Sequence, residues 1–162
     1  MRTNFTNLRT TRIGKAGEDL AQKHFTAKGF YVYRPPKGKS HPFDMVLVDK
    51  DMNVIFCEIK TYPKRFAYND TGVDEKDWRT LYKAYHKQLA PVWIVFIDVP
   101  LKRMYYFEMT AALVDAARTD AGKTYFPISM SKVLIPVIGD VSMAKLRTAA
   151  TYTPKAKGTA AY

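Results

Sequence analysis

The sequence predicts a single α/β domain in which a mixed β-sheet is flanked by helices. The chain has 162 residues, of which 47% are hydrophobic and 14% aromatic. This is enough for one hydrophobic core and too little for two ordinary domains. Helical and strand-like patterns also alternate along the chain, in the order helix, three strands, helix, two strands and helix, which is typical of a sheet covered by helices.

Each element is predicted from its own hydrophobic spacing and from the residues that end it. The first helical pattern stops at Gly29, and the second has Trp78, Leu81, Tyr82 and Leu89 on one stripe. The predicted helices span residues 13–28, 74–89 and 110–118. The predicted strands span residues 31–33, 43–48, 56–60, 92–99 and 103–109. Because Tyr82 and Tyr85 both lie on the apolar stripe, we favour core packing over DNA contact for them.

Basic residues are concentrated at the two ends of the chain. Lys and Arg number 26 against 15 Asp and Glu, a formal net charge of +11. Residues 1–40 hold nine basic and two acidic residues, residues 141–162 hold four basic and none acidic, and the middle is balanced. A neutral body with basic ends is typical of a protein that contacts a polyanion through its flanking segments, although a basic surface that only aids solubility would look the same.

This charge distribution predicts three regions, and the composition excludes several classes of protein. We expect a basic arm over residues 1–11, a domain over residues 12–140 and a basic, partly disordered tail over residues 141–162. No apolar run is long enough to cross a bilayer and the N-terminus lacks a signal-peptide pattern, so we expect an intracellular protein in the cytoplasm or at the nucleoid. The three histidines lack the spacing of a zinc site, and no phosphate-binding loop of an ATP-driven helicase or translocase is present. Cys57 lies in an apolar run and is predicted to be buried.

The predicted hairpin brings two acids together. If Val48 pairs with Val54, then Asp44 lies opposite Glu58, and Lys60 points to the same face of the sheet. Two facing carboxylates on a largely apolar sheet require protonation, a cation from the protein, or a metal ion. Lys60 alone can form a structural salt bridge with one acid, which is the common reason for a Glu-x-Lys sequence in a strand. The second acid leaves net negative charge, which favours a hard divalent cation.

A third acid, Glu18, lies beside the apolar stripe of the first predicted helix. It precedes Ala21 and Phe25 by three and seven residues, so it can reach over the edge of the sheet. The alternative explanation is that a glutamate in the first turn of a helix interacts favourably with the helix dipole.

Taken together, these segments resemble the PD-(D/E)xK nuclease superfamily, and in particular its small Holliday-junction-resolvase-like members. The matching segments are Gly14-Lys-Ala-Gly-Glu18, Phe43-Asp44 and Glu58-Ile-Lys60, and the resemblance covers about residues 12–98. One departure is that Phe43 separates Pro42 from the acid. The resemblance implies a restriction-endonuclease-like fold and a metal-dependent deoxyribonuclease that hydrolyses phosphodiester bonds, on branched or structured DNA. It also implies Mg²⁺ as the cofactor, with Mn²⁺ able to substitute. Symmetric cutting of two strands would in addition require a homodimer.

The same resemblance assigns roles to individual residues. The implied catalytic residues are Glu18, Asp44, Glu58 and Lys60. The implied metal ligands are Asp44, Glu58, Ile59 and Glu18. The implied DNA contacts are Arg12, Lys15, Lys37, Lys39, Ser40, Lys64 and Arg65. Two other functions stay open, namely a nucleic-acid-binding module that keeps the fold without cutting, and a site-specific or repair endonuclease on the same core.

Overall fold

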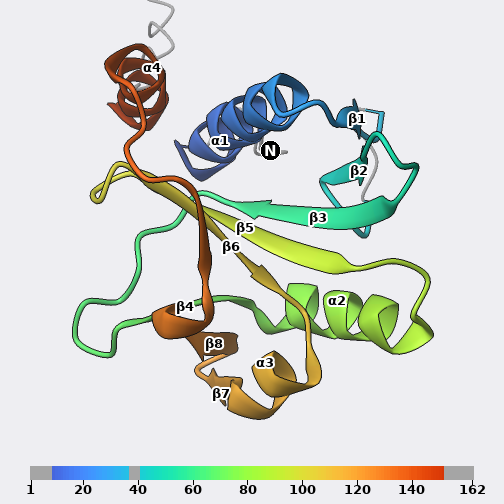
Figure 1. Cartoon of the computed structure of the whole chain (residues 1–162). Coiled ribbons are helices and arrows are strands. Elements are labelled where there is room, and N and C mark those ends of the chain that lie inside the picture. The colour runs from blue at the N-terminus through green and yellow to red at the C-terminus, as the bar shows by residue number, and fades with distance from the viewer. Residues whose placement is uncertain (1–8, 37–40, 152–162) are drawn as a thin grey trace, which may run out of the picture.

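In the computed structural model, which describes residues 9–36 and 41–151, a six-stranded sheet lies between two layers (Figure 1). Helices α1 (Arg9–Ala27) and α4 (Asp140–Thr151) cover one face. Helices α2 (Glu75–Lys87) and α3 (Ala111–Ala116) and a three-stranded sheet cover the other. The predicted mixed sheet flanked by helices is confirmed. Among the described residues, no helix is both long and apolar enough to span a membrane.

The central sheet is mixed because one pair of neighbouring strands is parallel. Its order is β1 (Tyr31–Tyr33), β2 (Met45–Val48), β3 (Val54–Lys60), β5 (Val92–Asp98), β6 (Arg103–Glu108) and β9 (Lys132–Ile135). Only β3 and β5 run parallel, and the chain between them forms β4 and α2. The smaller sheet has the order β4 (Asp70–Asp74), β8 (Lys123–Pro127) and β7 (Arg118–Asp120), and a short 3-10 helix, η2 (Ile128–Met130), follows β8.

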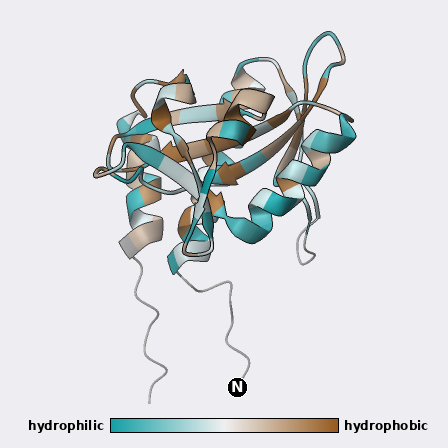
Figure 2. Ribbon diagram, turned by 90° about the horizontal axis from the view of Figure 1, so that it is seen from below, coloured by the Kyte–Doolittle hydropathy of each residue, from teal (hydrophilic) through white to brown (hydrophobic). Residues whose placement is uncertain are grey.

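The central sheet separates two hydrophobic cores. Along β3, Ile55, Cys57 and Ile59 face the core beneath α1, whereas Phe56 packs against the core beneath α2. Figure 2 shows the result, with hydrophobic strands at the centre and hydrophilic outer faces on the helices. The predicted burial of Cys57 and the predicted core packing of Tyr82 and Tyr85 are confirmed. Residues 58 and 60 alternate with 57 and 59, so Glu58 and Lys60 face the α2 layer.

Several boundaries differ from the predictions, among them the start of the first helix, the end of the second helix and the start of the tail. The first helix begins at Arg9, so residues 9–11 of the expected basic arm are helical. Helix α2 ends at Lys87, and Leu89 is 74% exposed instead of extending the apolar stripe. Residues 141–151 of the expected tail belong to α4, whose buried Met143 and Leu146 pack in the core beneath α1. Residues 1–8 and 152–162 lie outside the described residues.

Candidate active site

The β2–β3 hairpin has the predicted register. Val48 pairs with Val54 and Met45 pairs with Cys57. One step further along the same register, Asp44 comes opposite Glu58. The backbone N–H of Asp44 donates to the carbonyl of Cys57 at 3.1 Å, and its Oδ2 accepts from the backbone N–H of Ile59 at 2.8 Å. The Asp44 carboxylate therefore continues the pairing of β3 where the backbone of β2 has ended.

Glu58 and Lys60 form an ion pair that also includes Asp77 of α2. The Lys60 Nζ lies 2.7 Å from Glu58 Oε1 and 2.6 Å from Asp77 Oδ2. The Glu58 residue is only 8% exposed. Sequence reasoning did not identify Asp77, because an acid in the first turn of a helix is ordinarily explained by the helix dipole. Two carboxylates thus contact a single ammonium group, and the nearby Asp44 carboxylate interacts with it electrostatically.

The protonation of these groups follows from burial and from their mutual repulsion. Burial raises the pKa of Glu58 to about 7. The charges of Asp44 and Asp77 also raise it, whereas Lys60 lowers it. Burial also raises the pKa of Asp44, although the hydrogen bond from Ile59 and the charge of Lys60 oppose this. Burial alone would lower the pKa of Lys60, but Glu58 and Asp77 outweigh it and the pKa is raised. Lys60 is therefore a permanent cation at neutral pH, while Asp44 and Glu58 retain protons more readily than usual.

Glu18 lies near this cluster but is bound by Arg34. Arg34 follows β1, and its guanidinium donates to Glu18, to Asp19 at 2.7 Å and to Gln22 at 3.1 Å. Burial raises the pKa of Glu18, and the charge of Asp44 adds to the effect, so the two carboxylates are close enough to repel. Because α1 begins at Arg9, Glu18 lies in the middle of the helix. The first-turn dipole explanation for Glu18 is therefore wrong.

The oxygen atoms at this site are suited to a hard divalent cation. Asp44 uses one carboxylate oxygen for Ile59, and Glu58 uses one for Lys60; the second oxygen of each makes no hydrogen bond to a described residue. In a strand the N–H and C=O of one residue point to the same neighbour, so the Ile59 carbonyl lies on the side of Asp44. Within residues 9–36 and 41–151, no group of three or more His, Cys, Asp or Glu side chains is gathered for a metal. Mg²⁺ commonly takes only one or two carboxylates and completes its shell with water and phosphate, so the donors fit Mg²⁺ or Mn²⁺.

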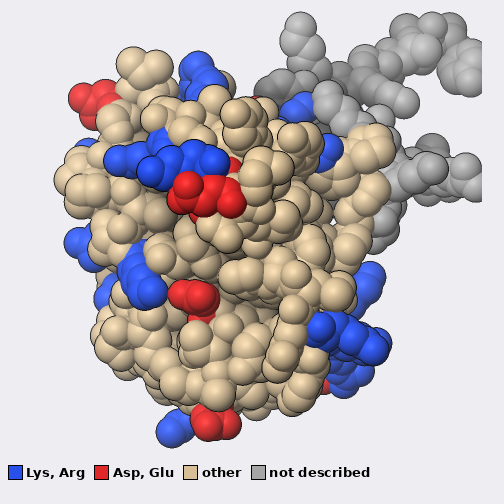
Figure 3. Space-filling model, turned by 45° about the vertical axis from the view of Figure 1, so that its right-hand side comes forward, with Lys and Arg blue, Asp and Glu red and all other residues tan. Residues whose placement is uncertain are grey.

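The residues expected to contact DNA are spread over several elements. Lys15 is exposed and Arg12 half-buried, both on α1. Lys64 donates to Asn69 at 2.7 Å, and Arg65 is paired with Asp70. Lys37, Lys39 and Ser40 lie outside the described residues. On the face shown in Figure 3, acidic side chains mostly lie beside basic ones.

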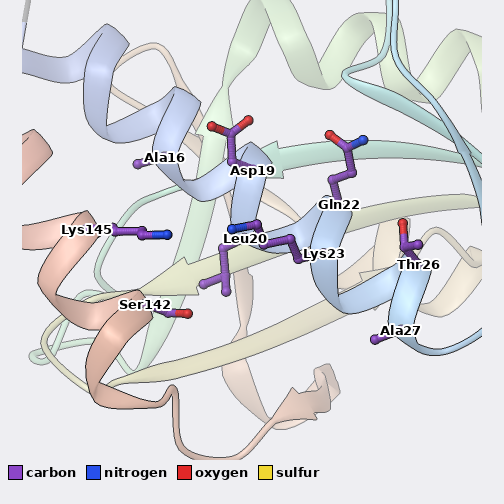
Figure 4. Close-up of a pocket in the computed structure, with 9 residues that line it drawn as sticks. All are labelled: Ala16, Asp19, Leu20, Gln22, Lys23, Thr26, Ala27, Ser142 and Lys145. Carbon is purple, nitrogen blue, oxygen red and sulfur yellow. The ribbon is translucent and has the colours of Figure 1, made fainter.

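A cavity of about 620 Å³ lies between α1 and α4, in the layer opposite α2. Lys23 and Lys145 point into it, whereas Asp19 and Gln22 point away from α4 (Figure 4). Neither Asp44, Glu58 nor Lys60 lines this cavity. It is therefore separate from the cluster of acids.

Comparison with known proteins finds similarity to solved structures. No protein-family model and no curated protein matches the sequence. The chain is similar to Hjc of Archaeoglobus fulgidus, a Holliday junction resolvase from an archaeal hyperthermophile, with 15% identity and a TM-score of 0.49. The match covers 72% of this chain and 94% of that chain.

Proposed function

We propose that this protein is a metal-dependent endonuclease that hydrolyses phosphodiester bonds in DNA. The observation that carries the proposal is the pairing of Asp44 with Glu58 across the hairpin, with Lys60 beside them on the same face. This arrangement concentrates negative charge in a partly buried place that one lysine cannot neutralise. A divalent cation supplies the missing positive charge, and phosphodiester hydrolysis is the reaction that such an ion and a neighbouring ammonium group can promote.

Each residue has a distinct task in this proposal. Asp44, Glu58 and the Ile59 carbonyl hold the cation, with Glu18 as a supporting acid once it is released from Arg34. When bound, Mg²⁺ neutralises charge on the phosphate and lowers the pKa of a water molecule. Lys60 donates hydrogen bonds to the developing negative charge. It does not act as the general base, because Glu58 and Asp77 oppose the loss of its proton.

Branched DNA is the substrate that we propose. The charge surplus lies at the two ends of the sequence and the middle is neutral. Such a distribution suits contacts with the phosphates of diverging arms better than rigid reading of base edges. Symmetric cutting of two strands would place two copies of the chain in a twofold dimer.

A non-catalytic DNA-binding module is the second candidate, and one observation favours it. The Lys60 ammonium is already bound by Glu58 and Asp77, as in a purely structural ion pair. Under this alternative, the protein would bind DNA without cleaving it, with or without a divalent cation.

The test is incubation of the full chain with supercoiled, linear, single-stranded and four-way-junction DNA, with Mg²⁺, Mn²⁺ or chelator. We expect metal-dependent cutting, with preference for the junction. Asp44→Asn should abolish cutting and leave binding intact or tighter, because it removes negative charge near the phosphate. Asp51→Asn is the matched control, since Asp51 is an exposed acid in the turn of the same hairpin. Cutting by Asp44→Asn within tenfold of the control would refute the site, and binding without cutting by the wild type would favour the second candidate.

A further inference from the structure

A short hairpin after β3 exposes two aromatic rings. We call residues 64–70 the aromatic hairpin. Phe66 is 66% exposed and Tyr68 is 71% exposed. The hairpin begins four residues after Lys60, so it extends from the strand that carries Glu58 and Lys60. Exposed aromatic residues gathered in one place on a soluble domain commonly mark a binding surface.

The backbone of the aromatic hairpin is fixed by Arg65 and Asp70. The Arg65 N–H donates to the Asp70 carbonyl at 2.8 Å. The Arg65 side chain makes two further bonds to the Asp70 carboxylate, at 2.7 Å from Nε and 2.6 Å from Nη2. Such two-pronged pairs restrict geometry as well as adding energy. The Arg65 guanidinium, which is predicted from the sequence to contact DNA, therefore holds the hairpin closed.

The hairpin is also attached to the central sheet. The backbone N–H of Lys64 donates to Asp98 Oδ2 at 2.9 Å. Asp98 is fully buried at the end of β5, the strand that pairs with β3 in parallel. The hairpin therefore has a defined position relative to Glu58 and Lys60.

Each exposed ring has a cation over it. The Arg65 guanidinium lies 4.4 Å from the centre of the Tyr68 ring and 3.4 Å from that of Tyr125 on β8. The Lys64 Nζ lies 5.3 Å from the centre of the Phe66 ring. Tyr68 and Tyr125 also line a cavity of about 530 Å³, which is within the usual range for ligand pockets. The rings are thus oriented by contacts to one side while most of their surface stays open to solvent.

We propose that the aromatic hairpin binds unpaired nucleobases by stacking them on Phe66 and Tyr68. Every base has an aromatic face, so stacking is tolerant of sequence. Bases within a duplex are already stacked on their neighbours, so the hairpin selects single-stranded or unpaired positions. The fixed rings lose little conformational entropy on binding. This inference deepens the proposed function, because it identifies the feature of branched DNA that the protein recognises next to its active site.

The experiment measures binding of the full chain, in chelator, to single-stranded DNA and to duplex DNA that carry the fluorescent base 2-aminopurine. Stacking quenches this base. Phe66→Ala and Tyr68→Ala should each weaken single-strand binding by about 5- to 150-fold, which corresponds to the 1–3 kcal/mol typical of one stacked base, and should reduce the quenching. Duplex affinity should change less than twofold. Leu89→Ala is the matched control. Leu89 is 74% exposed and lies just after the C-terminal end of α2, outside the aromatic hairpin, so its replacement should have no effect.

Phe66→Leu separates stacking from simple apolar contact, because leucine retains apolar area without an aromatic face. It should lose the quenching as Phe66→Ala does, and thermal melting should show that all variants are folded. Losses no greater than that of Leu89→Ala, or equal losses on duplex, would overturn the proposal. The proposal would also be overturned if Phe66→Ala and Tyr68→Ala abolished self-association of the chain and left single-strand affinity unchanged, because the rings would then bind a second copy of the chain. Binding is measured in chelator and cleavage is measured separately with Mg²⁺, so failure of the nuclease proposal would appear as intact stacking in chelator without cleavage in Mg²⁺. Failure of the stacking proposal would appear as cleavage in Mg²⁺ with unchanged single-strand affinity in chelator.

Discussion

Helix α1 packs tightly at Gly17, next to Glu18, against the residue that follows β3 and against β5. A Cβ atom built on Gly17 would lie 2.0 Å from Thr61 Oγ1 and 3.1 Å from Ile97 Cδ1. Real Cβ contacts are essentially never below 3.0 Å. Gly17→Ala must therefore move either Thr61 or the helix. Gly14, in the same helix, has nothing within 4 Å of the corresponding position and provides the matched control.

Two opposing effects set the change in the free energy of unfolding that each glycine-to-alanine substitution causes. Alanine favours a helix over glycine by about 0.5–1 kcal/mol, and this gain applies to both positions. Overpacking a core contact costs about 1–3 kcal/mol, and this applies only to position 17. We therefore expect Gly14→Ala to stabilise the protein by about 0.5–1 kcal/mol. Gly17→Ala should destabilise it by about 1 kcal/mol, and it should lower DNA cleavage because Glu18 moves with the helix.

Thr61 provides a direct test of this explanation. Its buried hydroxyl makes no hydrogen bond, so Thr61→Ala removes an unsatisfied polar group. In the double variant, the nearest remaining neighbours of the added methyl group are at 3.1 and 3.2 Å, which small adjustments accommodate. Urea denaturation of the four proteins should give a coupling free energy of about 1 kcal/mol or more in favour of the double variant. If Gly17→Ala is as stabilising as Gly14→Ala, α1 lies further from the sheet than described.

Three further predictions concern the acids around Lys60. In chelator, Glu58→Gln should stabilise the protein most above pH 7, by up to about 3 kcal/mol. The raised pKa of about 7, against 4.5 ordinarily, makes ionised Glu58 unfavourable in the folded state, so the gain should fall away between pH 7 and 4.5 in pH-dependent denaturation. Saturating Mg²⁺ or Ca²⁺ should raise the melting temperature by about 5 °C or more at 100 times Kd, whereas Asp44→Asn should melt higher in chelator and show no rise with metal; a lower melting point in chelator would instead favour a structural salt bridge. Asp77→Asn should keep the metal-induced rise but reduce cleavage about tenfold, because Lys60 loses a partner that positions it; an unchanged rate would show that Asp77 has no part in catalysis.

The central hairpin could be predicted because its sequence leaves little freedom. In β2 and β3 every second apolar residue is buried in the core beneath α1, and shifting the pairing by one residue would move this set to the other face of the sheet. The turn at residues 49–53 adds to this, since Asp49 accepts hydrogen bonds from the backbone of Asp51 and Asn53. The positions of Asp44, Glu58 and Lys60 follow from that register alone. This is why the candidate site was predictable from local sequence.

The three-stranded sheet was not predictable in the same way. Strands β4 and β8 are short, and their buried residues include Thr71, Gly72 and Thr124, which are not typical of a strand core. Gly72 is required there because a Cβ atom would lie 2.3 Å from the carbonyl of Thr124 on the neighbouring strand. Such strands are stabilised by their partner and by the packing of the whole layer. A local hydrophobic pattern therefore does not reveal them.

The sequence did not reveal the residues that contact the site, for a related reason. These residues help to decide between a structural salt bridge and a catalytic site. Arg34 and Asp77 approach the acids from elements that are distant in sequence. A structural salt bridge needs one acid for one lysine, whereas Lys60 serves Glu58 and Asp77 and leaves Asp44 to a backbone N–H. The N–H of Ile59 orients the Asp44 carboxylate. Because this N–H carries only a partial charge, it does not neutralise the carboxylate. Asp44 is consequently held in place, partly buried and still in need of a cation, which is the condition that a metal ligand must meet before its metal arrives.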